Sequence, residues 1–255
     1  LWNREMPSGV AKIKPEPFDP DNPLQVVYFP ACPSRCMSGP ARAESESEDL
    51  PQKTISLLKK AGYQIIYPEN LESHCCGQAF ESKGFFKQAN DKSDELNRSL
   101  IKASGDGMIP VLCDTSPCLL RMKENLDSKL KLYEPIEFVL EFLLDKLKFT
   151  PLVSKVALHV TCSARKMGLD DKLTILAKTC ATEVVVPEDI YCCGFAGDRG
   201  FNYPELNASA LEGLKQQTKG CSAGYSTSKT CEIGLSLHAE IPYRSILYLV
   251  DAATE

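Results

Sequence analysis

Cys75-Cys76-Gly77-Gln78-Ala79 and, later in the chain, Cys192-Cys193-Gly194-Phe195-Ala196-Gly197 are the two stretches that decide how this sequence is interpreted. Adjacent cysteines do not easily form a disulfide with each other, because the short link strains the geometry that the bond prefers. Neighbouring thiolates repel, so a cation that binds both is the simplest reason for such a pair. Gly77 and Gly194 have no Cβ, which lets backbone amides approach a cofactor that the sulfurs hold. The recurrence of the triplet predicts a duplicated metal-thiolate site.

Length and composition limit the class of protein. The chain has 255 residues, of which 43% are hydrophobic and 25% charged, as expected for one large or two ordinary globular domains. The net charge of −5, without any basic run, argues against a nucleic-acid partner. We find no apolar stretch of membrane-spanning length and no secretory signal. The twelve cysteines therefore indicate thiol chemistry or metal binding in a cytoplasmic protein rather than a disulfide framework.

Strand-like and helix-like segments alternate along the chain, and the order of the first half recurs in the second. Short β-branched or aromatic runs predict strands at residues 25–29, 63–67, 108–112, 155–160 and 183–186. Apolar residues at helical spacing predict helices at residues 51–61, 85–103, 137–147, 171–180 and 204–219. This alternation indicates an α/β protein made of two tandem Rossmann-like halves with mainly parallel sheets, related by a pseudo-twofold duplication. Ligands of such folds bind at the carboxyl ends of the strands.

The same pattern divides the chain into three parts. Residues 1–24 contain five prolines and little periodicity, which predicts an extended linker or arm. Residues 25–150 form the first predicted cysteine-rich half and residues 151–255 the second. The sequence begins with Leu1 rather than with an initiating methionine, so we expect that the chain was cut from a larger protein.

An internal alignment of the two halves sorts the cysteines. Cys32-Pro33-Ser34-Arg35 corresponds to Cys162-Ser163-Ala164-Arg165, and Thr115-Ser116-Pro117-Cys118 corresponds to Ser228-Lys229-Thr230-Cys231. Together with the adjacent pairs, this predicts two equivalent sets of metal ligands: Cys32, Cys75, Cys76 and Cys118, and Cys162, Cys192, Cys193 and Cys231. The other four cysteines face different residue types in the alignment and are predicted to be buried apolar side chains or incidental thiols: Cys36, Cys113, Cys180 and Cys221.

Four thiolates are the ligand set of a cubane iron-sulfur cluster or of a structural zinc ion. Zinc sites commonly use two short Cys-x-x-Cys hooks, which neither half contains, whereas scattered ligands suit the wider perimeter of a cluster. Eight ordinary core cysteines would not explain the adjacent pairs. Arg35 and Arg165 each follow the first ligand of their half by three residues. Each could offset thiolate charge at the cofactor or be an ordinary salt-bridge partner, and the sequence leaves both interpretations open.

The pattern of one cysteine, then Cys-Cys-Gly, then one cysteine, present twice from about Gln25 onward, resembles the cysteine-rich (CCG) domain family. Members include the B subunit of heterodisulfide reductase and the iron-sulfur subunits of glycolate oxidase and anaerobic glycerol-3-phosphate dehydrogenase. Two stretches, residues 192–201 and 225–232, look like the C-terminal part of FAD-linked, iron-sulfur D-lactate dehydrogenases. One departure matters: heterodisulfide reductase-type members have Cys-x-x-Cys where this chain has Thr115 and Ser228, which favours ordinary [4Fe-4S] ligation.

The resemblance implies a role and partners. It implies an electron-transfer part of a flavin-linked D-lactate (or other D-2-hydroxy acid) dehydrogenase, with one or two [4Fe-4S] clusters and no catalytic residues of its own. FAD would lie in an upstream or partner module, a ferredoxin-like module would accompany it, and electrons would pass toward quinone or a cytochrome. Peripheral association with the inner face of the cytoplasmic membrane would suit this role. The alternatives are one of the other iron-sulfur subunits named above, a zinc-stabilised scaffold, or a thiol-disulfide enzyme that uses an adjacent cysteine pair.

Overall fold

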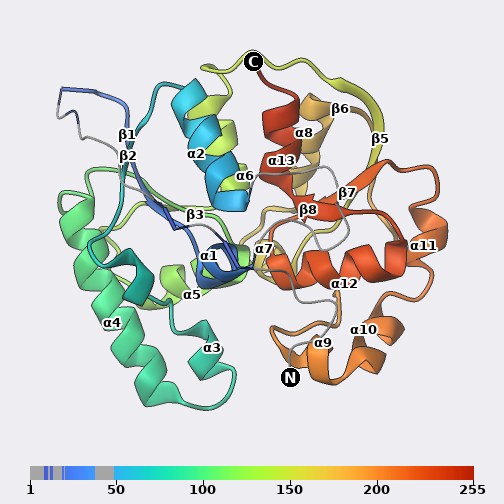
Figure 1. Cartoon of the computed structure of the whole chain (residues 1–255), viewed down its shortest axis with the longest axis horizontal. Coiled ribbons are helices and arrows are strands. Elements are labelled where there is room, and N and C mark those ends of the chain that lie inside the picture. The colour runs from blue at the N-terminus through green and yellow to red at the C-terminus, as the bar shows by residue number, and fades with distance from the viewer. Residues whose placement is uncertain (1–8, 11, 14–18, 20, 38–48) are drawn as a thin grey trace.

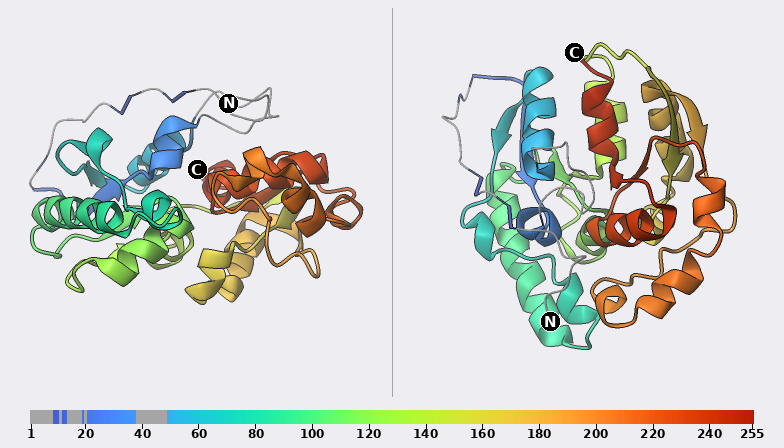
Figure 2. Two further views of the ribbon diagram at one scale, coloured as in Figure 1. Left: turned by 90° about the horizontal axis from the view of Figure 1, so that it is seen from below. Right: turned by 45° about the vertical axis from the view of Figure 1, so that its right-hand side comes forward.

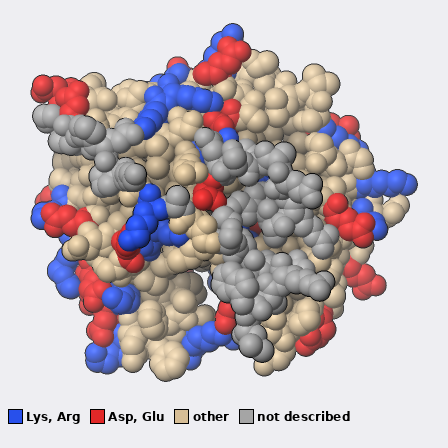
Figure 3. All heavy atoms as spheres, in the orientation of Figure 1, with Lys and Arg blue, Asp and Glu red and all other residues tan. Residues whose placement is uncertain are grey.

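The computed structural model describes residues 9–10, 12–13, 19, 21–37 and 49–255, and Figure 1 shows the course of the chain. Most of the predicted arm at residues 1–24 therefore lies outside the described residues. On the face drawn in Figure 3, acidic and basic side chains are interspersed and form no continuous basic patch. Among the described helices, none combines the length and the apolar character needed to span a bilayer.

Two four-stranded sheets, one in each half, form the framework. The first has the order β2-β1-β3-β4, built from β1 (Gln25–Phe29), β2 (Gln64–Ile66), β3 (Val111–Cys113) and β4 (Leu132–Tyr133). The second has the order β6-β5-β7-β8, built from β5 (Leu152–Leu158), β6 (Ala181–Val185), β7 (Ala223–Ser226) and β8 (Tyr243–Ser245). All neighbouring strands in both sheets are parallel. The predicted α/β fold with two Rossmann-like halves is confirmed, because the second sheet repeats the connectivity of the first.

Helices follow nearly every strand. In the first half they are α1 (Cys32–Cys36), α2 (Leu50–Lys60), the 3-10 turn η1 (Leu71–Ser73), α3 (Gln78–Glu81), α4 (Phe86–Ala103), α5 (Ser116–Asn125) and α6 (Pro135–Phe138) with its π-helical continuation η2 (Val139–Leu143). In the second half they are α7 (Cys162–Lys166), α8 (Asp170–Cys180), α9 (Arg199–Asn202), α10 (Pro204–Ala210), α11 (Leu214–Gln217), α12 (Lys229–Ala239) and α13 (Ile246–Ala252). The single helix predicted over residues 204–219 is thus wrong. It breaks before α11 at Gly213, whose φ of 81° lies in the left-handed region.

The core is divided by the strands, because successive side chains of a strand point to opposite faces of the sheet. Val26 and Tyr28 of β1 belong to a large core that also contains Val156 and Leu158 of β5. Helices α2 and α6 of the first half contact α13 and α8 of the second here, and Figure 1 shows the four grouped together between the sheets. The outer faces are covered by α4 and α5 in one half and by α11 and α12 in the other. Figure 2 shows the two halves from two further directions.

The carboxyl ends of the central strands meet where the halves join. Ser116, at the start of α5, lies against Thr227, directly after β7. The Ser116 amide donates to the Thr227 carbonyl at 3.1 Å, and the Ser116 hydroxyl donates to Thr227 Oγ1 at 2.6 Å. Both residues are buried. This contact brings the ends of the two sheets, where ligands are expected in such folds, to one region of the molecule.

Candidate metal centre

Each half takes its cysteines from three places that the fold brings together. Cys32 and Cys162 are the first residues of α1 and α7, which follow the central strands β1 and β5 almost directly. In α7 the preceding Thr161 accepts a hydrogen bond from the Ala164 amide at 3.1 Å and so caps the helix. The last cysteine of each set lies in the first turn of the helix that follows the other central strand, α5 or α12. The adjacent pair comes from the turn before α3 or α9.

The first set, Cys32, Cys75, Cys76 and Cys118, forms a chain of contacting thiols that we call the first quartet. Cys32 is hydrogen-bonded to Cys75, Cys75 to Cys76, and Cys76 to Cys118. The Gly77 amide donates to Cys75 Sγ at 3.3 Å. Sequence analysis predicted these residues as one ligand set, and the fold brings all of them together.

The second set, Cys162, Cys192, Cys193 and Cys231, forms the second quartet in the same order. Cys162 is hydrogen-bonded to Cys192 and Cys192 to Cys193, while Cys193 Sγ lies 3.0 Å from Cys231 Sγ. The Gly194 amide donates to Cys192 Sγ at 3.3 Å, as Gly77 does in the first half. The two halves therefore repeat the arrangement contact by contact.

The cysteines outside these sets have varied surroundings. Cys36 is exposed at the end of α1, Cys180 is buried in the core shared by the two halves, and Cys221 is buried in the cluster that also contains Cys193. Cys113 at the end of β3 lies near the first quartet, and burial and the nearby Cys118 raise its pKa. The first quartet thus has a buried, neutral thiol beside it that the second lacks.

Both glycines of the cysteine turns are required by their surroundings. Gly77 has a φ of 89°, and a Cβ added to it would lie 2.4 Å from the Ala89 carbonyl oxygen in α4. Gly194 has a φ of 68°, and its Cβ would lie 2.5 Å from the Leu206 carbonyl oxygen in α10. The turn can approach the following helix this closely only without a side chain, which also places its amide beside a sulfur.

Two residues that sequence analysis missed hold the carbonyls of the adjacent pairs. Arg121 of α5 is fully buried, donates from Nε to the Cys76 carbonyl at 2.9 Å, and forms a 2.5 Å ion pair with Glu81. Asn207 of α10 plays this part in the second half, where its side-chain amide donates to the Cys193 carbonyl. Arg121 follows Cys118 by three residues, so helical spacing could have placed it near the site, but no such signal exists for Asn207.

The two arginines of the internal alignment behave differently. Arg35 donates from Nη2 to Cys32 Sγ at 3.4 Å and to the His74 carbonyl at 2.5 Å, and from Nη1 to the Leu71 carbonyl at 2.7 Å. Arg165 instead pairs with Asp170 at 3.0 Å and lies over the Tyr191 ring at 5.2 Å. Of the two open interpretations, thiolate contact fits Arg35 and a salt bridge fits Arg165.

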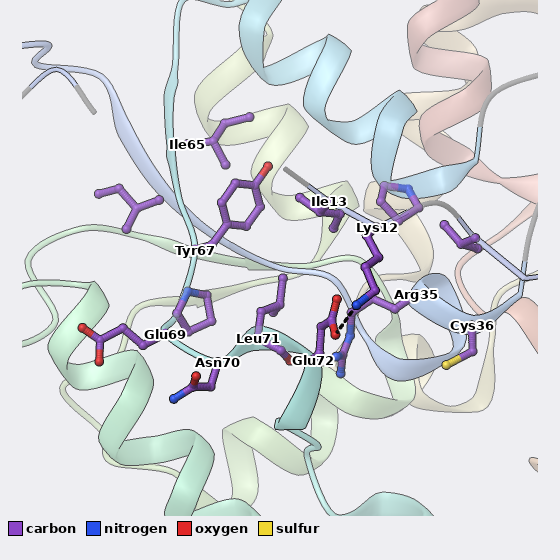
Figure 4. A pocket seen from close by; sticks show the side chains of 14 residues that line it. Lys12, Ile13, Arg35, Cys36, Ile65, Tyr67, Glu69, Asn70, Leu71 and Glu72 are labelled. Atoms are coloured by element: carbon purple, nitrogen blue, oxygen red, sulfur yellow. Dashed lines mark hydrogen bonds and ion pairs between the residues drawn. The ribbon is translucent and has the colours of Figure 1, made fainter. Parts of the chain in front are cut away.

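A pocket of about 680 Å³ lies on the far side of Arg35, at the edge of the first sheet (Figure 4). Ile65 and Tyr67 line it from β2 and the residue after it, and Leu71 lines it from η1. An ion pair of 3.2 Å between Lys12 and Glu72 lies among the residues drawn in Figure 4. The pocket was not predicted, because its walls come from segments far apart in the sequence.

The hydrogen bonds within the quartets govern their charge. In the first quartet, hydrogen bonds with Cys32 and then Cys76 lower the pKa of Cys75 to about 2, with smaller contributions from the Gly77 amide and Arg35. The hydrogen bond to Cys75 and burial raise the pKa of Cys32. In the second quartet, the hydrogen bond to Cys193 and burial raise the pKa of Cys192, and burial raises that of Cys162. The first quartet therefore stabilises one thiolate at its centre.

The donor chemistry fits an iron-sulfur cluster, although the sulfurs lie closer together than metal ligands do. In the described part of the chain, no group of three or more His, Cys, Asp or Glu side chains is arranged to hold a metal ion. The 3.0 Å separation of Cys193 and Cys231 is shorter than the roughly 3.8 Å edge of a tetrahedral zinc-thiolate site. Four convergent thiols with amide donors aimed at sulfur are nevertheless the groups that such clusters need. The sulfurs would move apart to accept a cluster or an ion.

Comparison with known proteins places the chain in a family. Residues 26–123 and 156–236 match the model of the cysteine-rich domain, CCG. The chain belongs to this cysteine-rich domain family. The predicted resemblance is confirmed, and both matched segments contain a complete quartet.

Relatives of this CCG protein include a dehydrogenase subunit and lactate utilization proteins. The C subunit of the anaerobic glycerol-3-phosphate dehydrogenase of Escherichia coli (strain K12) is 30% identical over 202 residues, which cover 71% of this chain and 50% of that protein. Lactate utilization protein A of Anoxybacillus flavithermus is 24% identical over 190 residues, covering 70% of this chain and 79% of that protein. The chain thus spans about half the length of the dehydrogenase relative. The solved Picrophilus torridus aspartate racemase covers 91% of this chain and 94% of its own, but its TM-score of 0.36 at 12% identity is too low to support any inference.

Proposed function

We propose that this chain is the iron-sulfur electron-transfer part of a flavin-linked dehydrogenase that oxidises D-lactate or another D-2-hydroxy acid. The single observation that carries the proposal is the pair of equivalent thiol quartets at the junction of two parallel sheets. The names of the relatives, one part of a dehydrogenase and the other a lactate utilization protein, support the reaction class. Flavin and ferredoxin-like modules would be partners or further parts of the protein, and quinone or a cytochrome would be the final acceptor.

Each quartet would hold one [4Fe-4S] cluster, which supplies transfer of one electron at a time when it is bound. The chain contributes position and environment. Gly77 and Gly194 aim amides at sulfur, and hydrogen bonds to cluster sulfur raise a reduction potential. Arg35 adds a positive charge beside Cys32 that favours the reduced, more negative state of the first site. Oxidation of the hydroxy acid would take place at the flavin, not in this chain.

Anaerobic reconstitution with iron and sulfide tests the proposal. We expect about four iron and four acid-labile sulfide atoms per quartet, with charge-transfer absorbance that bleaches on reduction. The double substitution Cys75→Ala and Cys76→Ala should remove one cluster, and Cys192→Ala with Cys193→Ala the other. Cys180→Ala is the matched control, because Cys180 is a buried cysteine outside both quartets, and it should leave loading unchanged. Stoichiometric zinc without sulfide would refute the cluster and support a zinc-stabilised scaffold.

A thiol-disulfide function has one observation in its favour. Cys193 Sγ and Cys231 Sγ lie 3.0 Å apart, so a small movement would allow them to form a disulfide with the loss of two electrons and two protons to an oxidant. Mild oxidation followed by alkylation and peptide mass analysis tests this function. A reversible Cys193–Cys231 disulfide in protein that takes up no iron would favour it over the cluster.

A further inference from the structure

The two quartets differ in their access to solvent, although they occupy equivalent positions in the repeat. Cys162 and Cys192 of the second quartet are exposed, whereas their counterparts Cys32 and Cys75 are half-buried and so less accessible to solvent. Tyr191, directly before the second pair, has 64% of its surface exposed, whereas His74, directly before the first pair, is half-buried. The duplication has therefore produced one enclosed thiol site and one that opens at the surface.

The arginines at equivalent positions of the two halves make different contacts beside the quartets. Arg35 donates to the carbonyls of Pro30, Leu71 and His74 as well as to Cys32 Sγ, so it fastens the segment before Cys75 over the first quartet. In the second half, Nε of Arg165 is drawn away to Asp170, and the guanidinium only stacks on the Tyr191 ring. The segment before Cys192 is held instead at Glu188, whose main chain makes two hydrogen bonds with the Gln217 side chain, and Arg165 makes no hydrogen bond to this segment among the described residues.

We infer that the second quartet is the port through which this molecule exchanges electrons with an external redox partner, and that the first quartet is the internal site. The inference rests on the proposed function, since it assumes that the quartets hold clusters. Electron transfer becomes steeply slower with distance, so the partner reaches the exposed site first. One electron leaves the reduced second cluster for a one-electron acceptor, and no bond is broken and no proton moves.

Thiol labelling of the full chain without cluster tests the access difference independently of electron transfer. Each cysteine is labelled with N-ethylmaleimide and, separately, with a bulky polyethylene glycol maleimide, and rates are read by peptide mass analysis. The ratio of the two rates cancels the intrinsic reactivity of each thiol and reports access alone. For Cys162 and Cys192, the rate with the bulky reagent divided by the rate with N-ethylmaleimide should equal the value measured for exposed Cys36. For Cys32 and Cys75 this ratio should be about tenfold lower. Equal ratios in the two quartets would overturn the inference.

A pair of matched variants tests the role of the arginine. Arg35→Gln removes the hydrogen bonds that hold the Leu71–His74 segment. At Cys75, the ratio of the bulky-maleimide rate to the N-ethylmaleimide rate should therefore rise about tenfold, toward the ratio at Cys192. Arg165→Gln makes the same chemical change in the second half and should leave the ratio of Cys192 unchanged. If Arg35→Gln leaves Cys75 protected, Arg35 does not enclose the first quartet.

Oxidation of the loaded protein by ferricyanide, a hydrophilic one-electron acceptor, tests the port itself. Variants that retain only the first or only the second quartet are reduced and mixed with ferricyanide, and the recovery of absorbance is followed. The second cluster should be oxidised faster than the first. Equal oxidation rates of the two clusters, or faster oxidation of the first cluster through the pocket beside Arg35, would refute the inference that the second quartet is the site of electron exchange. Failure of either variant to assemble a cluster would refute the proposed function instead, while the labelling result would still stand.

Discussion

Replacement of Gly77 by alanine tests whether the cysteine turn must lie against the following helix. Gly77 has a φ of 89°, and an added Cβ would lie 2.4 Å from the Ala89 carbonyl oxygen. The contact is with backbone rather than with a flexible side chain, so α4 or the turn itself must move. Because the Gly77 amide donates to Cys75 Sγ at 3.3 Å, any movement of the turn also disturbs the first quartet.

The magnitude follows from two separable costs. A non-glycine residue in the left-handed region costs about 1–2 kcal/mol, partly offset by the smaller entropy of the unfolded chain. Forcing an extra methyl group into packed structure adds about 1–3 kcal/mol. We therefore expect Gly77→Ala to lower the free energy of unfolding by about 3 kcal/mol. Gly84 is the matched control, because its φ of 82° is nearly the same but its Cβ would meet nothing within 4 Å. Gly84→Ala should cost only about 1 kcal/mol.

Urea unfolding followed by far-UV circular dichroism gives both free energies, and iron content after reconstitution gives the effect on the site. Gly77→Ala should lose both stability and first-quartet loading, whereas Gly84→Ala should lose little of either. If the two variants differ by less than about 0.5 kcal/mol, the close approach to α4 is not a packing constraint and the reasoning fails. Gly194→Ala, with the Leu206 carbonyl at 2.5 Å, should behave as Gly77→Ala does but affect the second quartet.

Three further predictions concern groups around the quartets. Arg121→Met leaves the Cys76 carbonyl without its arginine and Glu81 without its ion pair, so urea unfolding should show a loss of about 3 kcal/mol. Ser116→Ala and Thr227→Val break the bond between the halves, and a double-mutant cycle should give a coupling of about 1 kcal/mol. Burial raises the pKa of Glu134 from 4.5 to about 7. The unfolded carboxyl loses its proton near pH 4.5 and the folded one near pH 7, so this group makes stability fall as pH rises across that window, by at most about 3 kcal/mol. Glu134→Gln should therefore reduce the fall measured by unfolding at a series of pH values.

The convergence of four cysteines in each half could be predicted from the sequence because the chain contains its own comparison. A parallel α/β topology places the carboxyl ends of neighbouring strands together, so a cysteine three residues after Phe29 and another near the start of α5 must approach each other. The alignment of the halves then separated the eight converging thiols from Cys36, Cys180 and Cys221, which belong to neither chain of contacting thiols. Cys113 was placed with these three, yet it lies beside Cys118, because alignment compares residue types and not distances.

Features that depend on tertiary contact could not be predicted. The spacing from Cys118 could have placed Arg121 near the site, but a buried arginine is rare, and its hydrogen bond to the Cys76 carbonyl depends on the tertiary fold. Strands β4 and β8 are only two or three residues long, too short for any periodicity to appear. The break at Gly213 had a sequence signal, but a single glycine inside a helical pattern is compatible with an unbroken helix.

Arg35 and Arg165 show that equivalent positions of a duplicated motif can make different contacts. Both arginines follow the first cysteine of their half by three residues and lie in the last turn of a short helix after a central strand. Arg165 has an acceptor, Asp170, at the start of α8, and this ion pair removes its Nε from the sulfur site. Arg35 forms no ion pair among the described residues, so its guanidinium donates to main-chain carbonyls and to Cys32 instead. The partner of the arginine therefore differs between the halves, while the order of the cysteine contacts stays the same.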